Sequence, residues 1–132
     1  MLGRLAAATM TATVIATVAT AAPALADDPV GVTQKQVDAG EVVAEVVLQP
    51  LVTNARAKMQ GIADGFVKLF ISPGSGRLLG GVVVGPRASE LIHPVTLAVT
   101  ERLTADEFAN TFTVYPSISG SIAEAARRLH QA

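Results

Sequence analysis

The sequence predicts an α+β fold in which an antiparallel sheet is covered by helices on one face. Two apolar runs of strand length, residues 66–71 and 78–84, flank the loop Ser72-Pro73-Gly74-Ser75-Gly76. Proline and glycine set the backbone angles that tight turns need, so this arrangement predicts a β-hairpin. Strand patterns come first along the chain and helical patterns follow after residue 87, which is the order expected of an α+β domain.

The second apolar run, residues 78–84, carries no charged side chain before Arg87. A strand without polar positions is typical of the middle of a sheet, where both faces are covered. We therefore expect this strand to be central and buried on both faces.

Length, charge and cysteine content exclude several classes of function. The chain has 132 residues, enough for one domain, and a net charge of −1. That balance gives no basis for a nucleic-acid or membrane-surface partner. The absence of cysteine from the sequence excludes disulfides, thiolate metal sites and a redox-active dithiol within these residues.

Residues 1–26 differ in composition from the rest of the chain. Arg4 precedes an apolar run rich in Ala, Thr and Val, and Ala24 and Ala26 provide the A-x-A pattern of a signal-peptide cleavage site. The pattern predicts a secretory signal peptide cleaved after Ala26, with the domain at residues 27–132. The alternative is a non-homologous leader that replaces an upstream strand. The threonines weaken the apolar run, so no stable membrane span is expected.

The first elements of residues 27–132 are predicted from caps and alternation. Thr33 and Gln36 form a capping box for a short helix within residues 28–40, which Gly40 ends. Residues 41–51 are rich in valine and predict a strand that Pro50 stops. Residues 54–60 carry neighbouring basic side chains and are expected to form a solvated edge or loop.

Residues 87–103 are predicted to form the main helix, because their apolar positions recur with helical spacing. Ser89 or Pro86 is expected to start it. Pro94 lies inside the pattern and removes one backbone donor, so a kink or a later start is expected there.

Two shorter helices are predicted downstream. Thr104 caps the first, which extends to Asn110 and carries two acidic residues in its first turn. Residues 111–117 are expected to be extended or looped. Ser119 or Ser121 caps the last helix, which continues to residue 129.

The chain offers few groups for chemistry. Residues 74–80, GSGRLLG, superficially match a dinucleotide fingerprint, but both flanks are predicted strands, whereas the fingerprint requires a helix after it. Neither His93 nor His130 has acidic neighbours at metal-ligand spacing. The histidines are therefore expected to have structural or surface roles. Ser117, Ser119 and Ser121 lie near no evident base, and no Gly-x-Ser-x-Gly elbow is present, so no nucleophile triad is predicted.

Several spaced motifs together resemble a known family. The run GRLLGGVVVGPRASELI, the upstream GVTQKQVDAG and NARAKM, and the downstream TVYPSISGSIAEAARRL occur in order across residues 30–129. They resemble the C-terminal dimerisation domain of the pyridine nucleotide-disulfide oxidoreductases. The Tyr-Pro-Ser sequence is most similar to the actinobacterial NAD(P)H-quinone reductase branch, which is dihydrolipoamide dehydrogenase-like.

The hexapeptide that begins at Tyr115 and ends at Gly120 is the informative part of this resemblance. In the family its first residue is a His and its sixth a Glu, and the pair acts as the general acid/base for a dithiol in the partner subunit. Both groups are replaced here, and a phenol is a poor base at neutral pH. The resemblance still implies that Tyr115 and Pro116 contact the flavin across the dimer, through the backbone carbonyl before the proline and a cis peptide. A turn tyrosine packed on the sheet is the structural alternative.

The resemblance implies an interface module of a flavin-dependent NAD(P)H oxidoreductase of quinone-reductase type. FAD and NAD(P)H are cofactors of the full-length family, whereas no cofactor and no catalytic residue are expected in these 132 residues alone. The expected partner is a second copy of the chain, or a separate chain with FAD and NAD(P) domains. The alternative is a small exported homodimeric interaction protein. If residues 1–26 are a signal peptide, we expect the protein to be exported. If they are not, we expect a cytoplasmic location, as for the family.

Overall fold

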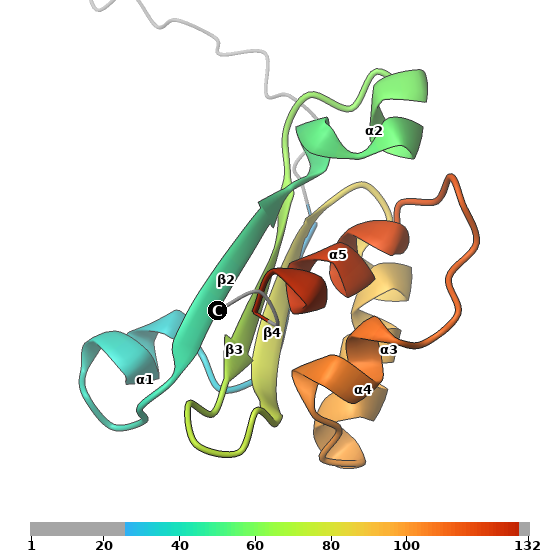
Figure 1. Ribbon diagram of the computed structural model, residues 1–132. Coiled ribbons are helices and arrows are strands. Elements are labelled where there is room, and N and C mark those ends of the chain that lie inside the picture. The colour runs from blue at the N-terminus through green and yellow to red at the C-terminus, as the bar shows by residue number, and fades with distance from the viewer. Residues whose placement is uncertain (1–25, 130–132) are drawn as a thin grey trace, which may run out of the picture.

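The structure, a computed structural model, describes residues 26–129. A four-stranded antiparallel sheet with the strand order β1-β4-β3-β2 forms its centre. Helices α3, α4 and α5 lie on one side of the sheet, and α1 and α2 lie at its two ends (Figure 1). The elements are β1 (Ala26–Gly31), α1 (Gln34–Asp38), β2 (Glu45–Pro50), a 3₁₀ turn (Leu51–Thr53), α2 (Ala55–Met59), β3 (Phe66–Ile71), β4 (Leu78–Gly85), α3 (Ala88–Thr100), α4 (Ala105–Ala109) and α5 (Gly120–Leu129). The predicted α+β class and the one-sided helical cover are confirmed.

The predicted hairpin is present as β3 and β4, which pair in antiparallel register with Val67 opposite Val83. Its turn is closed by two backbone hydrogen bonds, from Ser72 N to Arg77 O and from Gly76 N to Ser72 O, both at 2.9 Å. The glycine-rich segment thus joins two strands, as predicted, and opens no helix.

The helical face of the sheet contains the hydrophobic core. Most of the fully buried core residues come from β3, β4, α3 and α5, and the 3₁₀ turn and α2 add Leu51 and Ala57. Those of the sheet and the two helices include Val67, Leu69, Val83, Val95, Ala98, Ala125 and Ala126. Helix α3 approaches the sheet closely at Gly81, where an added Cβ would lie 2.8 Å from Val95 Cγ1. A glycine in the central strand therefore sets the distance between sheet and helix.

The opposite face of the sheet is less covered, so the expectation that residues 78–84 are buried on both faces is wrong. Val82 and Val84 are half-buried, and Val46 and Leu48 of β2, on the far side of β3, are 40% and 44% exposed. Side chains alternate across a strand, so a continuous apolar run can still present one row to a face without helices.

Strand β1 was not predicted. It pairs along its length with β4, with Ala26 opposite Gly85 and Gly31 opposite Gly80. Pro29 is compatible with this position because β1 is an edge strand.

The predicted signal peptide lies almost entirely outside the described residues, and only Ala26, the first residue of β1, falls within them. Between residues 26 and 129, no helix combines the length and the apolar character needed to cross a bilayer.

The predicted caps of the two short helices are confirmed, and each has a complete capping box. Thr33 and Gln36 cap α1, and Thr104 and Glu107 cap α4. Strand β2 begins at Glu45, later than the predicted start at residue 41, and includes Pro50 as its last residue.

Helices α3 and α5 differ in detail from the prediction. Helix α3 begins at Ala88, after Arg87 in a left-handed conformation (φ 62°), and continues through Pro94 without a later start. Ser119 directly precedes α5, whereas Ser121 lies inside that helix and is fully buried. Of the two predicted caps, only Ser119 therefore has a suitable position.

Candidate functional site

The segment with Tyr115 and Pro116 forms part of the loop that joins α4 to α5. The peptide bond between these two residues is cis, as the resemblance implied. Tyr115 is 85% exposed, and its carbonyl oxygen accepts no hydrogen bond from any residue between 26 and 129. The alternative of a tyrosine packed on the sheet is wrong, because the residue is exposed.

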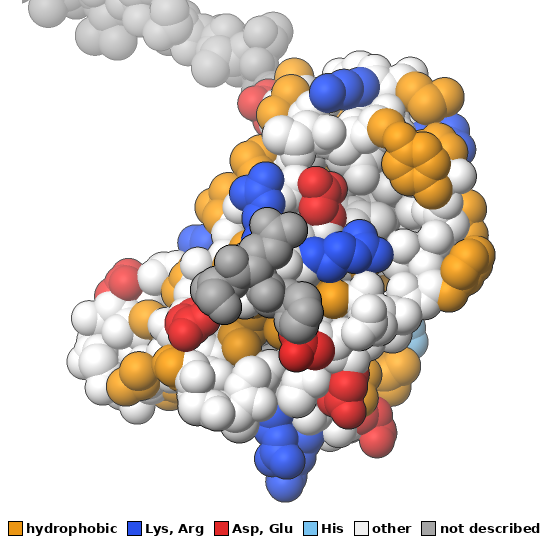
Figure 2. All heavy atoms as spheres, viewed as in Figure 1, with side chains coloured by type: hydrophobic (Ala, Val, Ile, Leu, Met, Phe, Trp, Pro, Cys, Tyr) orange, Lys and Arg blue, Asp and Glu red, His pale blue; other side chains and the backbone are white. Residues whose placement is uncertain are grey.

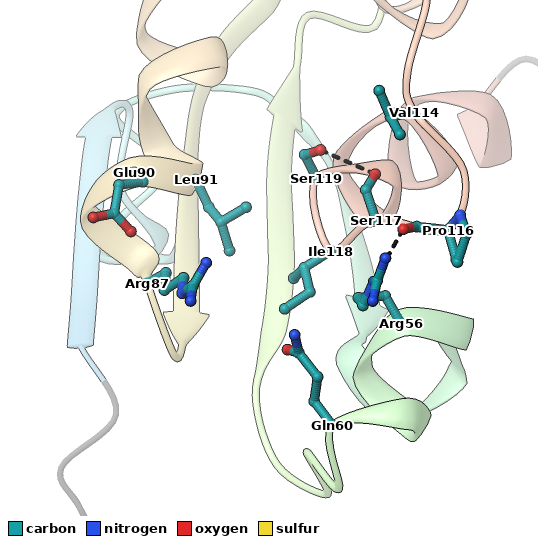
Figure 3. Close-up of a pocket in the computed structure, with 10 residues that line it drawn as sticks. All are labelled: Arg56, Gln60, Arg87, Glu90, Leu91, Val114, Pro116, Ser117, Ile118 and Ser119. Atoms are coloured by element: carbon teal, nitrogen blue, oxygen red, sulfur yellow. Dashed lines mark hydrogen bonds between the residues drawn. The ribbon is translucent and has the colours of Figure 1, made fainter.

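Two side chains hold this loop, one from α2 and one from the residue directly before that helix. Arg56 Nε donates to Pro116 O at 3.1 Å, and Asn54 Nδ2 donates to Ser117 O at 2.9 Å. Figure 3 shows Arg56 directed at the Pro116 carbonyl. The two carbonyls that follow Tyr115 are thus fixed by residues about 60 positions away in the sequence.

Asn54 has two roles, because it also caps α2. Its Oδ1 accepts from Arg56 N at 2.9 Å and from Ala57 N at 3.1 Å. The side chain is 8% exposed, and both ends of its amide are engaged. The prediction of a solvated edge or loop at residues 54–60 is therefore wrong. The sequence does contain a signal for this helix, since an asparagine directly before the helix-forming run ARAKM is a typical N-cap.

The serines of the loop order its junction with α5. Ser117 Oγ accepts from Gly120 N at 3.1 Å and lies 3.1 Å from Ser119 Oγ. These contacts satisfy a backbone donor at the start of α5, so the two serines have a structural role in this loop.

An open groove of about 730 Å³ lies between the loop and the start of α3 (Figure 3). Val114 and residues 116–119 line one side, Arg56 and Gln60 come from α2, and Arg87, Glu90 and Leu91 line the opposite side. A second pocket of about 410 Å³ lies beside it and includes Tyr115, Glu124 and Arg127. The exposed surface of the loop is therefore flanked by concave regions on both sides.

The described residues provide no acid/base pair in the hexapeptide, because its first residue is Tyr115 and its sixth is Gly120. His93 is exposed on α3, and His130 lies outside the described residues. Within residues 26–129, no three His, Asp or Glu side chains lie close enough together to hold a metal ion. The hexapeptide itself offers backbone, hydroxyl and apolar groups, and the groove beside it adds the charged side chains of Arg56, Arg87 and Glu90.

Comparison with known proteins identifies the domain. The family model for the pyridine nucleotide-disulphide oxidoreductase dimerisation domain matches residues 15–126. The chain is 57% identical over 100 residues to an NAD(P)H dehydrogenase (quinone) of Mycobacterium tuberculosis, covering 76% of this chain and 20% of the relative. It is 36% identical over 94 residues to a dihydrolipoyl dehydrogenase of Mycobacterium leprae, covering 71% of this chain and 20% of the relative.

Solved structures agree with this result. The crystal structure of LpdA from Mycobacterium tuberculosis matches with a TM-score of 0.76 and 55% identity, over 78% of this chain and 22% of that one. The flavoprotein disulfide reductase RclA from Escherichia coli matches with a TM-score of 0.72 over 78% of this chain and 23% of that one. Its 21% identity shows the fold alone.

The chain spans about a fifth of the length of the relatives it matches. The resemblance to the family and to its actinobacterial quinone-reductase branch is confirmed by the identity to the Mycobacterium tuberculosis enzyme. The chain belongs to the pyridine nucleotide-disulphide oxidoreductase dimerisation-domain family.

Proposed function

We propose that this chain is the dimerisation and interface module of a flavin-dependent NAD(P)H oxidoreductase of the quinone-reductase type. The observation that carries this proposal is the 57% identity over 100 residues to an NAD(P)H dehydrogenase (quinone). Identity at this level covers 76% of this chain, so the module is expected to fit the same enzyme architecture.

The module acts together with FAD and NAD(P) domains that lie outside these 132 residues, in the same polypeptide or in a separate chain. We propose that these 132 residues are not catalytic alone, because the hexapeptide lacks the family's acid/base pair and the glycine-rich segment 74–80 joins two strands. Its contribution is to form the dimer and to present the Tyr115 loop to the flavin.

Tyr115 and Pro116 are proposed as the flavin contact across the dimer. The carbonyl of Tyr115 accepts no hydrogen bond from residues 26–129 and is left for a ligand, and the next two carbonyls are held by Arg56 and Asn54. A segment fixed in this way suits a polar contact to a cofactor ring, because little conformational entropy remains to be lost on binding. The flavin, when bound, supplies the site that accepts hydride from NAD(P)H.

Dithiol–disulfide exchange is not the proposed reaction. The first and sixth positions of the hexapeptide hold Tyr115 and Gly120, neither of which serves as a general base near neutral pH. A quinone can accept electrons from a reduced flavin without a cysteine pair, which agrees with the activity named for the Mycobacterium tuberculosis relative.

The N-terminal segment is proposed to be part of the domain and not a signal peptide. The family match begins at residue 15, within the apolar run, and cleavage after Ala26 would remove the residue that pairs with Gly85. The exported interaction protein remains the alternative, because Ala24 and Ala26 fit the cleavage pattern.

N-terminal sequencing after expression in a host with a Sec pathway distinguishes a segment that belongs to the domain from a cleaved signal peptide. Retained Met1 supports the domain assignment, and a new N-terminus at Asp27 supports export.

A chimera tests the proposed function. The matched 100-residue segment of the Mycobacterium tuberculosis enzyme is replaced by the corresponding residues of this chain. We expect the chimera to retain flavin absorbance and to reduce quinones with NAD(P)H within about tenfold of the parent enzyme, a loss of roughly 1.4 kcal/mol in transition-state stabilisation. A folded chimera without flavin or without turnover would contradict the proposal.

A further inference from the structure

The groove between the α4–α5 loop and the start of α3 is lined by two arginine side chains from different elements. Arg56 belongs to α2 and Arg87 directly precedes α3, and Figure 3 shows them on opposite sides of Ile118. Glu90 is the one acidic residue of the lining, so two arginines and one glutamate give the groove a net charge of +1. Basic and acidic side chains are otherwise mixed over the face drawn in Figure 2, and the whole chain has a net charge of −1. The groove is therefore locally suited to an anion.

Both guanidinium groups keep N–H donors that a ligand can use. Arg56 donates only from Nε, to Pro116 O at 3.1 Å, and its Nη groups have no acceptor among residues 26–129. The Arg87 side chain has no hydrogen bond or ion pair within the same range. Its backbone is nevertheless fixed, because Arg87 O accepts from Glu90 N at 3.1 Å and from Leu91 N at 3.0 Å. The groove thus holds cationic donors on an ordered backbone that the fold itself does not use.

The first turn of α3 adds to this potential. Arg87 occupies the N-cap position with a left-handed backbone (φ 62°), and its side chain does not cap the helix. The first amides of an α-helix carry partial positive charge and attract anions. Glu90 lies in the same turn and offsets part of this attraction, so it should compete with a bound anion.

Apolar side chains form much of the remaining wall. Leu91 and Ile118 are half-buried, and Val114 is 65% exposed. The groove volume of about 730 Å³ is within the range of small-molecule sites, roughly 300–1,000 Å³. A planar guanidinium pairs with a carboxylate through two parallel hydrogen bonds. A net charge of +1 matches a singly charged carboxylate better than a phosphate, which carries up to two charges at pH 7.

We propose that this groove binds a small ligand that joins one carboxylate to an apolar body. The carboxylate pairs with Arg87, the apolar body lies against Leu91 and Ile118, and Arg56 adds positive potential from across the groove. The inference goes beyond the proposed function, because Tyr115 does not line this groove. An occupant would contact Pro116 and Ser117, so the loop that presents Tyr115 should respond to binding.

Amide NMR spectra of the full chain, titrated with three probes, test the proposal. The probe 2-naphthoate has both the carboxylate and an apolar body, 2-naphthamide has the body without the charge, and acetate has the charge without the body. We expect 2-naphthoate to bind with a Kd on the order of 1 mM and to shift the amides of residues 87–91 and 117–119. The other two probes should bind at least about tenfold more weakly, since each lacks one of the two interactions.

Four variants assign the binding to the named side chains. Arg87→Gln should weaken 2-naphthoate binding about tenfold or more, and Arg87→Lys should restore part of it. Glu90→Gln should tighten binding about two- to fivefold, because it removes a competing carboxylate. Arg102→Gln is the matched control, since Arg102 is also exposed and left-handed (φ 56°) but does not line the groove. It should leave the affinity unchanged.

Equal binding of 2-naphthoate and 2-naphthamide would overturn the proposal, as would shifts confined to residues outside the groove. Unchanged affinity in Arg87→Gln, or no shifts with 2-naphthoate at about 10 mM, would overturn it too. The spectra show at the same time whether each variant is folded. These results do not depend on the quinone-reductase chimera, so the proposed function and the ligand site can fail separately.

Discussion

Arg56 Nε donates a hydrogen bond to the carbonyl oxygen of Pro116 at 3.1 Å, across 60 residues of sequence. Asn54, two residues before it, reaches Ser117 O at 2.9 Å. One short helix thereby fixes the loop that presents Tyr115, so the position of the candidate flavin contact depends on residues that do not touch it.

This arrangement predicts a graded response to substitution. Asn54→Ala loses the cap and the bond to Ser117 O, and should lower the free energy of unfolding by about 2–3 kcal/mol. Arg56→Ala loses one partly buried bond and should lower it by about 1 kcal/mol. Urea unfolding measures both, and hydrogen exchange should show faster amide exchange at residues 113–119.

Asn54→Asp isolates the long-range bond, because a carboxylate still caps α2 but no longer donates to Ser117 O. The loop should exchange faster in this variant while α2 remains protected. Lys58→Ala, an exposed change on the same helix, is the matched control. Unchanged exchange in the loop of Asn54→Asp would contradict the role given to the amide.

The C-terminus of α3 predicts a stabilising change. Arg102 has φ 56° and follows the C-cap Glu101, and the bonds from Arg102 N to Val99 O and from Leu103 N to Ala98 O form a Schellman motif. Glycine adopts this conformation without the steric cost that arginine carries. Arg102→Gly should therefore raise the free energy of unfolding by about 0.5–1 kcal/mol, whereas Arg102→Ala should not. Destabilisation by the glycine in thermal unfolding would show that the arginine side chain has a separate role.

The spacing between α3 and the sheet predicts a large difference between two glycines. A methyl group at Gly81 would lie 2.8 Å from Val95 Cγ1 and 3.0 Å from Lys68 O. Gly81→Ala should therefore destabilise the fold by about 1–3 kcal/mol. A methyl group added at Gly74 in the hairpin turn would meet no atom within 4 Å. Gly74→Ala should therefore change the free energy of unfolding by less than about 0.5 kcal/mol. Equal effects of the two changes in urea titrations would contradict the close approach of α3.

The capping box of α4 predicts a dependence on pH. Hydrogen bonds from the Thr104 backbone amide and hydroxyl lower the pKa of Glu107 from its ordinary value. When folding lowers the pKa of a carboxyl group, the ionised group stabilises the folded state at pH values above the ordinary pKa. This stabilisation is lost as the pH falls through the lowered pKa of the folded state. Glu107→Gln should therefore destabilise the domain at pH 7 and lose this effect under acidic conditions.

Urea titrations of both proteins at pH 7 and at about pH 3 measure the difference, which should become smaller at the lower pH. Glu124→Gln, an exposed position on α5, gives the baseline for the loss of one carboxylate. A difference that grows as the pH falls would contradict the sign.

The hairpin, both capping boxes and the class of the fold were predictable because each depends on neighbouring residues. Turn chemistry between residues 72 and 76 and caps at Thr33 and Thr104 are local signals. Strand β1 was not predictable, because its sequence ADDPVG has little β propensity. It forms a strand because β4 provides an edge with which it can pair. The tertiary structure overrides the local preference there.

The candidate site was only half predictable for the same reason. Tyr115 and Pro116 were identified through their resemblance to a family motif. Asn54 and Arg56 were missed, because hydrogen bonds between residues about 60 positions apart leave no pattern in one sequence. The left-handed backbone at Arg87 was equally hidden, since an arginine does not indicate positive φ as a glycine does.

The role of Tyr115 as a backbone contact is tested most directly by Tyr115→Phe in the chimera with the Mycobacterium tuberculosis quinone reductase. The substitution removes the hydroxyl and keeps the ring and the carbonyl. If the carbonyl is the functional group, flavin absorbance should be unchanged and NAD(P)H-to-quinone turnover should stay within about threefold, less than 1 kcal/mol in activation free energy. A loss on the order of a hundredfold with flavin still bound, about 2.7 kcal/mol, would show that the hydroxyl takes part in the reaction and would contradict this role.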